Sequence, residues 1–93
     1  MSNSRIPRKK IIDWLKDRLR VLEESEKRDY VVLKRGGLSD REIAEYRQTY
    51  RKYLEKLIRC PKLIPKVHEM EVASRIIVVG FKAKWELLSL IHI

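Results

Sequence analysis

The feature that most constrains the fold is a pair of breaks, at Gly36–Gly37 and at Pro61, with a periodic segment between them. Glycine is unfavourable inside a helix, and proline disfavours helical geometry in the residue before it, so each break ends an element. Ser39 and Glu42 have the spacing of a capping box, in which two side chains satisfy backbone N–H groups at a helix start. We therefore expect a helix from about Asp40 to Arg59.

Apolar side chains recur at three-and-four spacing in this segment and also in an earlier one, from about Pro7 to Lys27. Such spacing places them on one face of a helix. The face of the later segment consists of Ile43, Tyr46, Tyr50, Tyr53, Leu54 and Leu57. The face of the earlier segment consists of Ile11, Ile12, Leu15, Leu19 and Leu22. The sequence thus predicts two amphipathic helices.

The last third of the chain has a different pattern. Lys66 to Ser74 predicts a short third helix, whereas the β-branched run Ile76–Val79 predicts a buried strand. From Phe81 to Leu87 apolar and charged residues alternate, which is typical of a half-exposed strand. Tyr30–Leu33 fits either a strand or an extension of the first helix. The expected fold is mainly α, with a short C-terminal β-strand or hairpin and hence an α+β tendency.

The length of 93 residues allows one small domain, which we assign to residues 1–87. Residues 88–93, Leu-Ser-Leu-Ile-His-Ile, correspond to the codons CTG TCT CTT ATA CAC ATC. These codons resemble the mosaic-end adapter of transposon-based sequencing libraries. We therefore interpret residues 88–93 as a translated adapter tail and residues 1–87 as an N-terminal fragment of a longer protein.

The chain has 22 Lys and Arg residues against 13 Asp and Glu, a formal charge of +9. A strong excess of cations favours partners that are polyanions, DNA or RNA first among them. Cys60 is the only cysteine, and no signal peptide or stretch of membrane-spanning length is visible. We expect a cytoplasmic protein that has no contact with a membrane.

The predicted binding residues are cations on the polar sides of the two helices, where successive phosphates would reward them through counterion release. Gln48 is the one candidate to read a base edge among them. Asp13 and Asp17 lie nearby, so an ordinary solvated helix face is the alternative. The full set is Arg8, Lys9, Lys10, Lys16, Arg20, Arg41, Gln48, Lys52, Lys56 and Arg59.

Residues 37–45 resemble the opening helix of a helix-turn-helix unit, with Ala44 as the small inward residue. The pattern departs from that unit at residues 46–50, where no turn-forming residue follows, so an uninterrupted helix is favoured. Tyr46, Tyr50 and Tyr53 are suited to stacking on bases. They share an arc with Ile43, however, and we interpret them as core residues, with Trp14 and Trp85 also packing inward.

Catalytic and metal-binding patterns are weak. Cys60 and His68 lack the companions that a metal site requires, and the acidic clusters at Glu23–Glu26 and Glu69–Glu71 adjoin no other reactive group. We expect no cofactor and no enzymatic activity. Two alternative functions remain: a helical module for protein interaction or homo-oligomer formation, and the helical preface of a truncated enzyme.

Overall fold

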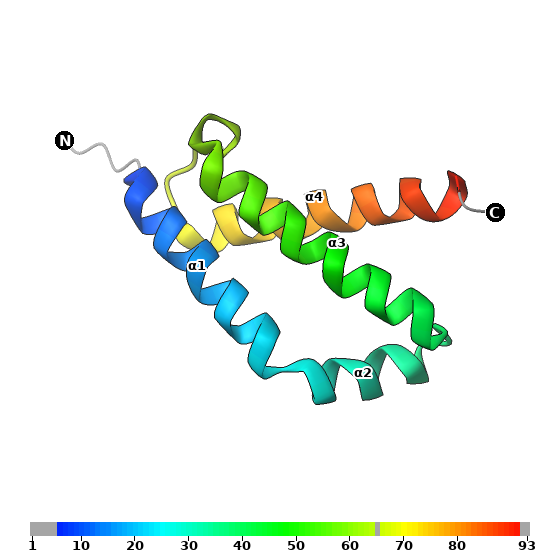
Figure 1. Ribbon diagram of the computed structural model, residues 1–93. Coiled ribbons are helices and arrows are strands. Elements are labelled where there is room, and N and C mark those ends of the chain that lie inside the picture. The colour runs from blue at the N-terminus through cyan, green and yellow to red at the C-terminus, as the bar shows by residue number, and fades with distance from the viewer. Residues whose placement is uncertain (1–5, 65, 92–93) are drawn as a thin grey trace.

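The computed structural model describes residues 6–64 and 66–91. The chain forms four α-helices, α1 (Arg8–Glu24), α2 (Glu26–Arg35), α3 (Asp40–Arg59) and α4 (Met70–Ile91), with a short 3-10 turn η1 (Pro61–Leu63) after α3. Figure 1 shows α1 and α3 running in opposite directions, α2 joining them at one end, and α4 crossing α3. None of these helices, over the described residues, has the length and apolar character needed to cross a membrane.

The first predicted helix is two helices. It begins as expected, directly after Pro7, but it is interrupted at Ser25, whose φ is −95° and ψ 12°. The Ser25 hydroxyl donates to Asp29 (2.9 Å), and Arg47 of α3 pairs with the same carboxylate at 2.5 Å and donates to the Leu22 carbonyl. Tertiary contacts from α3 thus stabilise the break. Residues 30–33, left undecided from the sequence, lie within α2.

The prediction for α3 is confirmed. Gly37 turns the chain with a φ of 95°, a conformation that favours glycine. The Glu42 N–H donates to the Ser39 hydroxyl (3.2 Å) and the Ser39 N–H donates to the Glu42 carboxylate (2.9 Å), which completes the capping box. The helix continues through residues 46–50 without a turn, so the helix-turn-helix alternative is wrong.

The predicted C-terminal strands are wrong, because the described residues of this region form α4. The predicted short helix, at residues 66–74, overlaps only the first turns of α4. Ala73, Ile77 and Phe81 are buried at intervals of four residues, which is a helical period. A strand pair here would have no sheet to join and would be marginal in water. A helix satisfies its own backbone groups and can bury these side chains against α3.

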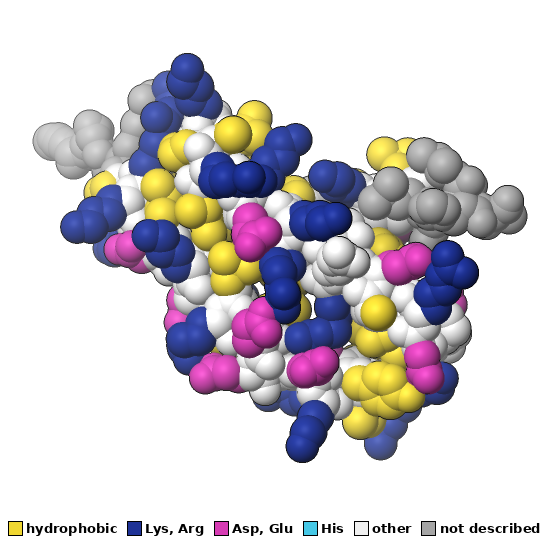
Figure 2. Space-filling view, viewed as in Figure 1, with side chains coloured by type: hydrophobic (Ala, Val, Ile, Leu, Met, Phe, Trp, Pro, Cys, Tyr) yellow, Lys and Arg dark blue, Asp and Glu magenta, His cyan; other side chains and the backbone are white. Residues whose placement is uncertain are grey.

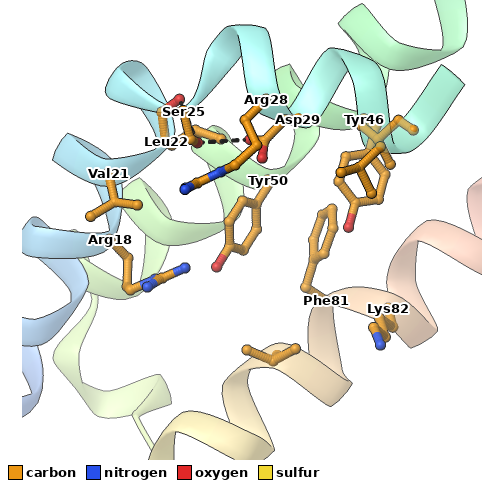
Figure 3. Close-up of a pocket in the computed structure, with 13 residues that line it drawn as sticks. Arg18, Val21, Leu22, Ser25, Arg28, Asp29, Tyr46, Tyr50, Phe81 and Lys82 are labelled. Carbon is orange, nitrogen blue, oxygen red and sulfur yellow. Dashed lines mark hydrogen bonds between the residues drawn. The ribbon is translucent and has the colours of Figure 1, made fainter. Parts of the chain in front are cut away.

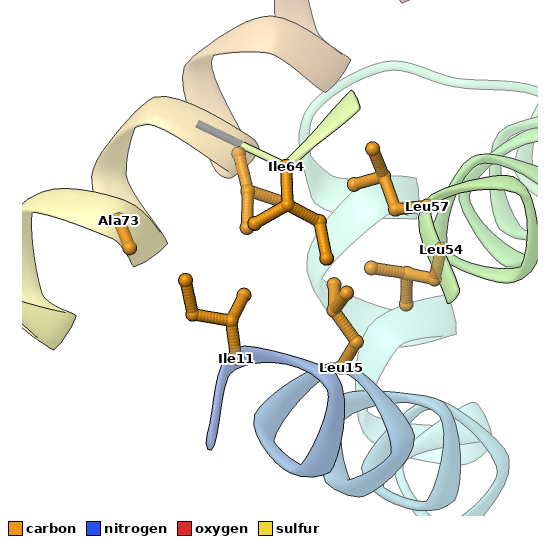
Figure 4. Close-up of a cluster of buried hydrophobic side chains, with 7 residues drawn as sticks. Ile11, Leu15, Leu54, Leu57, Ile64 and Ala73 are labelled. Carbon is orange, nitrogen blue, oxygen red and sulfur yellow. The ribbon is translucent and has the colours of Figure 1, made fainter. Parts of the chain in front are cut away.

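The apolar core lies between α1, the second half of α3 and the start of α4 (Figure 4). Its buried members are Ile11, Leu15, Leu54, Leu57, Ile64, Ala73 and Ile77. Farther along α4, Phe81 is 2% exposed and contacts three tyrosines of α3, with ring centroids 4.7 Å apart for Tyr50 and 5.2 Å apart for Tyr46. All three tyrosines are half-buried here, which confirms the expectation that their rings pack inward, at the edge of the core.

At Gly80 the backbone of α4 lies close to a side chain of α3. The Tyr53 hydroxyl donates to the Ile77 carbonyl at 2.9 Å, and a Cβ added at Gly80 would lie 2.8 Å from that hydroxyl oxygen. Glycine costs roughly 1 kcal/mol relative to alanine inside a helix. Glycine is nevertheless favoured at this position, because any larger side chain would collide with the Tyr53 hydroxyl.

A double-mutant cycle tests this contact. We expect Gly80→Ala to lower the free energy of unfolding by about 1 kcal/mol. The added methyl group breaks the hydrogen bond between the Tyr53 hydroxyl and the Ile77 carbonyl, and this loss exceeds the gain in helix propensity. In a Tyr53→Phe background the same change should raise it by about 1 kcal/mol, since the clash is gone. Urea unfolding followed by circular dichroism measures both. An equal effect of Gly80→Ala in the two backgrounds would contradict the explanation.

We expect the stability of the start of α3 to decrease in acid, because two carboxylates there have lowered pKa values. The hydrogen bond from Lys34, followed by that from Tyr30, lowers the pKa of Asp40, and the backbone N–H of Ser39 lowers the pKa of Glu42. The stabilisation from each carboxylate is present above its ordinary pKa and is lost as the pH falls through the lower folded value. We expect Asp40→Asn/Glu42→Gln to reduce the thermal midpoint at neutral pH and to flatten its fall below about pH 4. Parallel melting profiles would show that these groups do not contribute.

Candidate nucleic-acid interface

The cations of two distant segments meet at one end of the molecule. α1 and α3 are antiparallel, so the start of α1 and the end of α3 lie together (Figure 1). A backbone hydrogen bond from Ile6 to Val67, 3.2 Å long, also joins the leader of α1 to the connector that follows η1. The nine cations here, which we call the basic end, are all exposed. They are Arg8, Lys9, Lys10, Lys16, Lys52, Lys56, Arg59, Lys62 and Lys66.

Charge is distributed unequally between the two ends of the helical hairpin. Residues 6–16 and 52–66 contain these nine cations and only two acids, Asp13 and Glu55, a net charge of +7. Residues 17–51 contain nine cations and eight acids, a net charge of +1. Figure 2 shows the same contrast: blue side chains gather over the upper part of the molecule, whereas blue and magenta alternate over the lower part.

Ion pairing follows the same division. Among the described residues, the cations in ion pairs are Arg20, Lys34, Arg41, Arg47, Arg51 and Arg75. No member of the basic end is among them. Its side chains therefore keep their full charge for an external anion.

On α3 the free cations form a stripe. Lys52, Lys56 and Arg59 follow one another at intervals of four and three residues, which places them on one side of the helix. The opposite side of the same segment carries Leu54 and Leu57, which are buried against α1. Burial of the apolar face thus turns the stripe towards solvent.

Two of the predicted binding residues differ from the others because neighbouring acids hold them. Arg20 donates to Asp17 at 2.5 Å and to Glu24 at 2.7 Å, and these partners, Asp17 first, raise its pKa. Arg41 pairs with Glu45 at 3.2 Å. Both guanidinium groups are already neutralised within their own helices, and a phosphate would have to displace a carboxylate.

The predicted base reader also lies away from the basic end. Gln48 is exposed and lines a surface depression together with Arg47, Arg51 and Asp40. Arg47 and Arg51 are themselves paired with acids, Asp29 and Glu23. Among the described residues, no unpaired cation lines this depression, so its attraction for a phosphate is weak.

Lys62 and Lys66 belong to the basic end but were not among the predicted residues. Lys62 lies in η1, and Lys66 lies at the start of the segment predicted as a short third helix, so neither belongs to the two amphipathic helices on which the predicted set was based. Their charge, which continues the run from Lys52 to Arg59, was a usable signal.

The groups considered for other chemistry gain no support from their surroundings. Cys60 is exposed at the C-terminal cap of α3, and His68 is exposed. Over the part of the chain that the structure describes, no cluster of His, Cys, Asp and Glu has the geometry of a metal site. Glu23 and Glu71 form ion pairs with arginines.

Comparison with known proteins identifies no relative of this chain. No family model matches the chain, and neither a curated protein nor a solved structure matches it. The proposals for this protein therefore rest on its own residues.

Proposed function

We propose that the protein binds DNA or RNA through the phosphate backbone, with the basic end as the contact surface. The observation that carries the proposal is the concentration of nine exposed cations around two acids, with none of the nine in an ion pair with a described residue. Polyanion binding releases condensed counterions, and its affinity grows with the number of phosphates that cations neutralise.

Little sequence preference is expected of this surface. Contacts from lysine and arginine to phosphates fix the position of a protein on a nucleic acid but carry no direct information about the bases. Gln48, the one candidate base reader, lies among paired charges and not in the basic end. The tyrosines of α3 are half-buried and pack against Phe81, which restricts the access of bases to their rings.

Two variants of equal net charge test the proposal. Lys56→Gln/Arg59→Gln removes two cations of the basic end, and Arg41→Gln/Arg75→Gln removes two cations that are paired with acids. We expect the first to weaken binding to a labelled random-sequence duplex and to reduce the slope of log affinity against log salt by about 2. The control should stay close to the original protein. Fluorescence anisotropy at several salt concentrations measures both.

Three results would refute it: no binding to duplex DNA or RNA at low ionic strength, binding that does not depend on salt, or equal losses in the two variants. The last result would mean that only the total charge matters and that the basic end is not the contact surface.

A second candidate function is protein interaction, favoured by the outer side of α4. Val72, Ile76, Val79 and Leu87 are 38%, 44%, 63% and 62% exposed. Exposed apolar residues that form a continuous stripe are typical of an interface. This surface differs from the one expected from the sequence, because the apolar face of α1 and the tyrosine arc of α3 pack inside the molecule.

Light scattering at several protein concentrations tests the second candidate. If α4 associates with another copy, the mean mass should rise with concentration, and Val79→Glu should suppress the rise because it buries a charge in the contact. Val31→Glu, at an exposed position on α2, introduces the same charge away from α4 and serves as the control. A mass that stays monomeric at all concentrations would exclude self-association.

A further inference from the structure

A cleft of about 370 Å3 lies between the junction of α1 and α2, the middle of α3, and α4. Its size falls in the lower part of the range of small-molecule sites, about 300 to 1,000 Å3. Most of its wall is apolar. The aliphatic and phenylalanine side chains that line it are Val21, Leu22, Val32, Leu33, Val78 and Phe81.

The cleft also has cations on its wall. Arg18, Arg28 and Lys82 line it, and none of them forms an ion pair with another described residue. Arg18 is 5.9 Å from the centroid of the Trp14 ring, a contact that leaves its charge in place. In Figure 3 the guanidinium group of Arg18 points towards the hydroxyl of Tyr50, and the side chain of Arg28 extends from α2 along the wall of the cleft.

One acid lines the cleft, and it is already engaged. Asp29 accepts a hydrogen bond from Ser25 at 2.9 Å and pairs with Arg47 at 2.5 Å. Because Arg47 already neutralises Asp29, Arg18 and Arg28 retain their charge towards the cleft. The Tyr50 hydroxyl makes no hydrogen bond to another described residue and adds a neutral donor.

We propose that this cleft binds a small amphipathic carboxylate, such as a medium-chain fatty acid. The apolar body would replace water along the aliphatic wall and the ring of Phe81. The carboxylate would lie between Arg18 and Arg28, since guanidinium groups match the planar geometry of a carboxylate and bind it more strongly than a neutral acceptor. A long-chain cation would meet the repulsion of the same two groups.

This site is independent of the proposed nucleic-acid contact. Arg18 and Arg28 belong to residues 17–51, outside the basic end, and the apolar wall has no role in phosphate binding. Loss of either function should therefore leave the other unchanged.

Calorimetric titration of the whole chain with decanoate, decanol and decyltrimethylammonium tests the charge requirement, with the two ions kept below their micelle concentrations and decanol below its solubility limit. We expect saturable binding of one decanoate, about tenfold tighter than decanol because of the charged hydrogen bonds, and no saturable binding of the cation. Equal affinities for decanoate and decanol, or no saturable decanoate binding, would overturn the proposal.

A pair of variants locates the site. Arg18→Gln/Arg28→Gln should weaken decanoate binding about tenfold. Lys52→Gln/Lys56→Gln, which lowers the net charge equally but leaves the cleft intact, should not change it. Equal losses of decanoate affinity in both variants would show that the affinity depends only on the total charge of the protein.

Ligand-induced shifts of methyl resonances locate the site independently. The methyl resonances of Val21 and Val78 should shift on binding, and those of Val72 should not. Shifts confined to the outer side of α4 would place the ligand elsewhere and refute the assignment, and this readout stands even if the arginine variant fails to fold.

Discussion

Ile11 and Leu15 of α1 pack against Leu54 and Leu57 of α3, and this contact fixes the antiparallel arrangement of the two longest segments of the helical hairpin. Each fully buried aliphatic side chain of this kind contributes about 1.5 to 3 kcal/mol relative to exposure. The contact also determines where charges lie. It brings the start of one helix to the end of the other, so cations far apart in sequence, such as Arg8 and Arg59, meet at one end.

The two ends of the hairpin use charge in different ways. At the end that contains α2, arginines stabilise the fold: Arg47 holds the Ser25 break, and Arg51 links α3 to Glu23 of α1. At the basic end no such pairing occurs among the described residues, and the like charges repel one another. This repulsion disfavours the compact state. A bound polyanion would relieve it, which gives the proposed function a thermodynamic basis as well as a geometric one.

The sequence predicted a helix correctly where its local signals agreed and incorrectly where they conflicted. The capping box, Gly37 and Pro61 all indicated the same bounds for α3, and the structure has those bounds. In α4 the signals conflicted. The β-branched run at 76–79 and the two-residue alternation after it indicated strands, while the burial of Ala73, Ile77 and Phe81 follows a helical period. The four-residue spacing of Ala73, Ile77 and Phe81 was visible in the sequence. The local sequence does not determine, however, which of the apolar residues in this region are buried. Of the predicted binding residues, exposure was foreseeable, and acids at helical spacing from Arg20 and Arg41 were visible in the sequence. Which of these spacings would form an ion pair was not, because Asp13 lies four residues after Lys9 and the two form no ion pair among the described residues.

The sequence by itself determined the existence of α1 and α3, the sharp turn between α2 and α3, and the excess of positive charge. These depend on contacts within a few residues and on composition, which local chemistry sets. Only the tertiary structure decided that α4 is a helix, that α1 ends at Glu24, and that a cleft lined by Arg18 and Arg28 opens between the helices. The end of α1 is stabilised by Arg47 of α3, and α4 packs on α3 where Tyr53 meets Gly80. The cleft is lined by residues of all four helices, and these contacts form only when the helices pack.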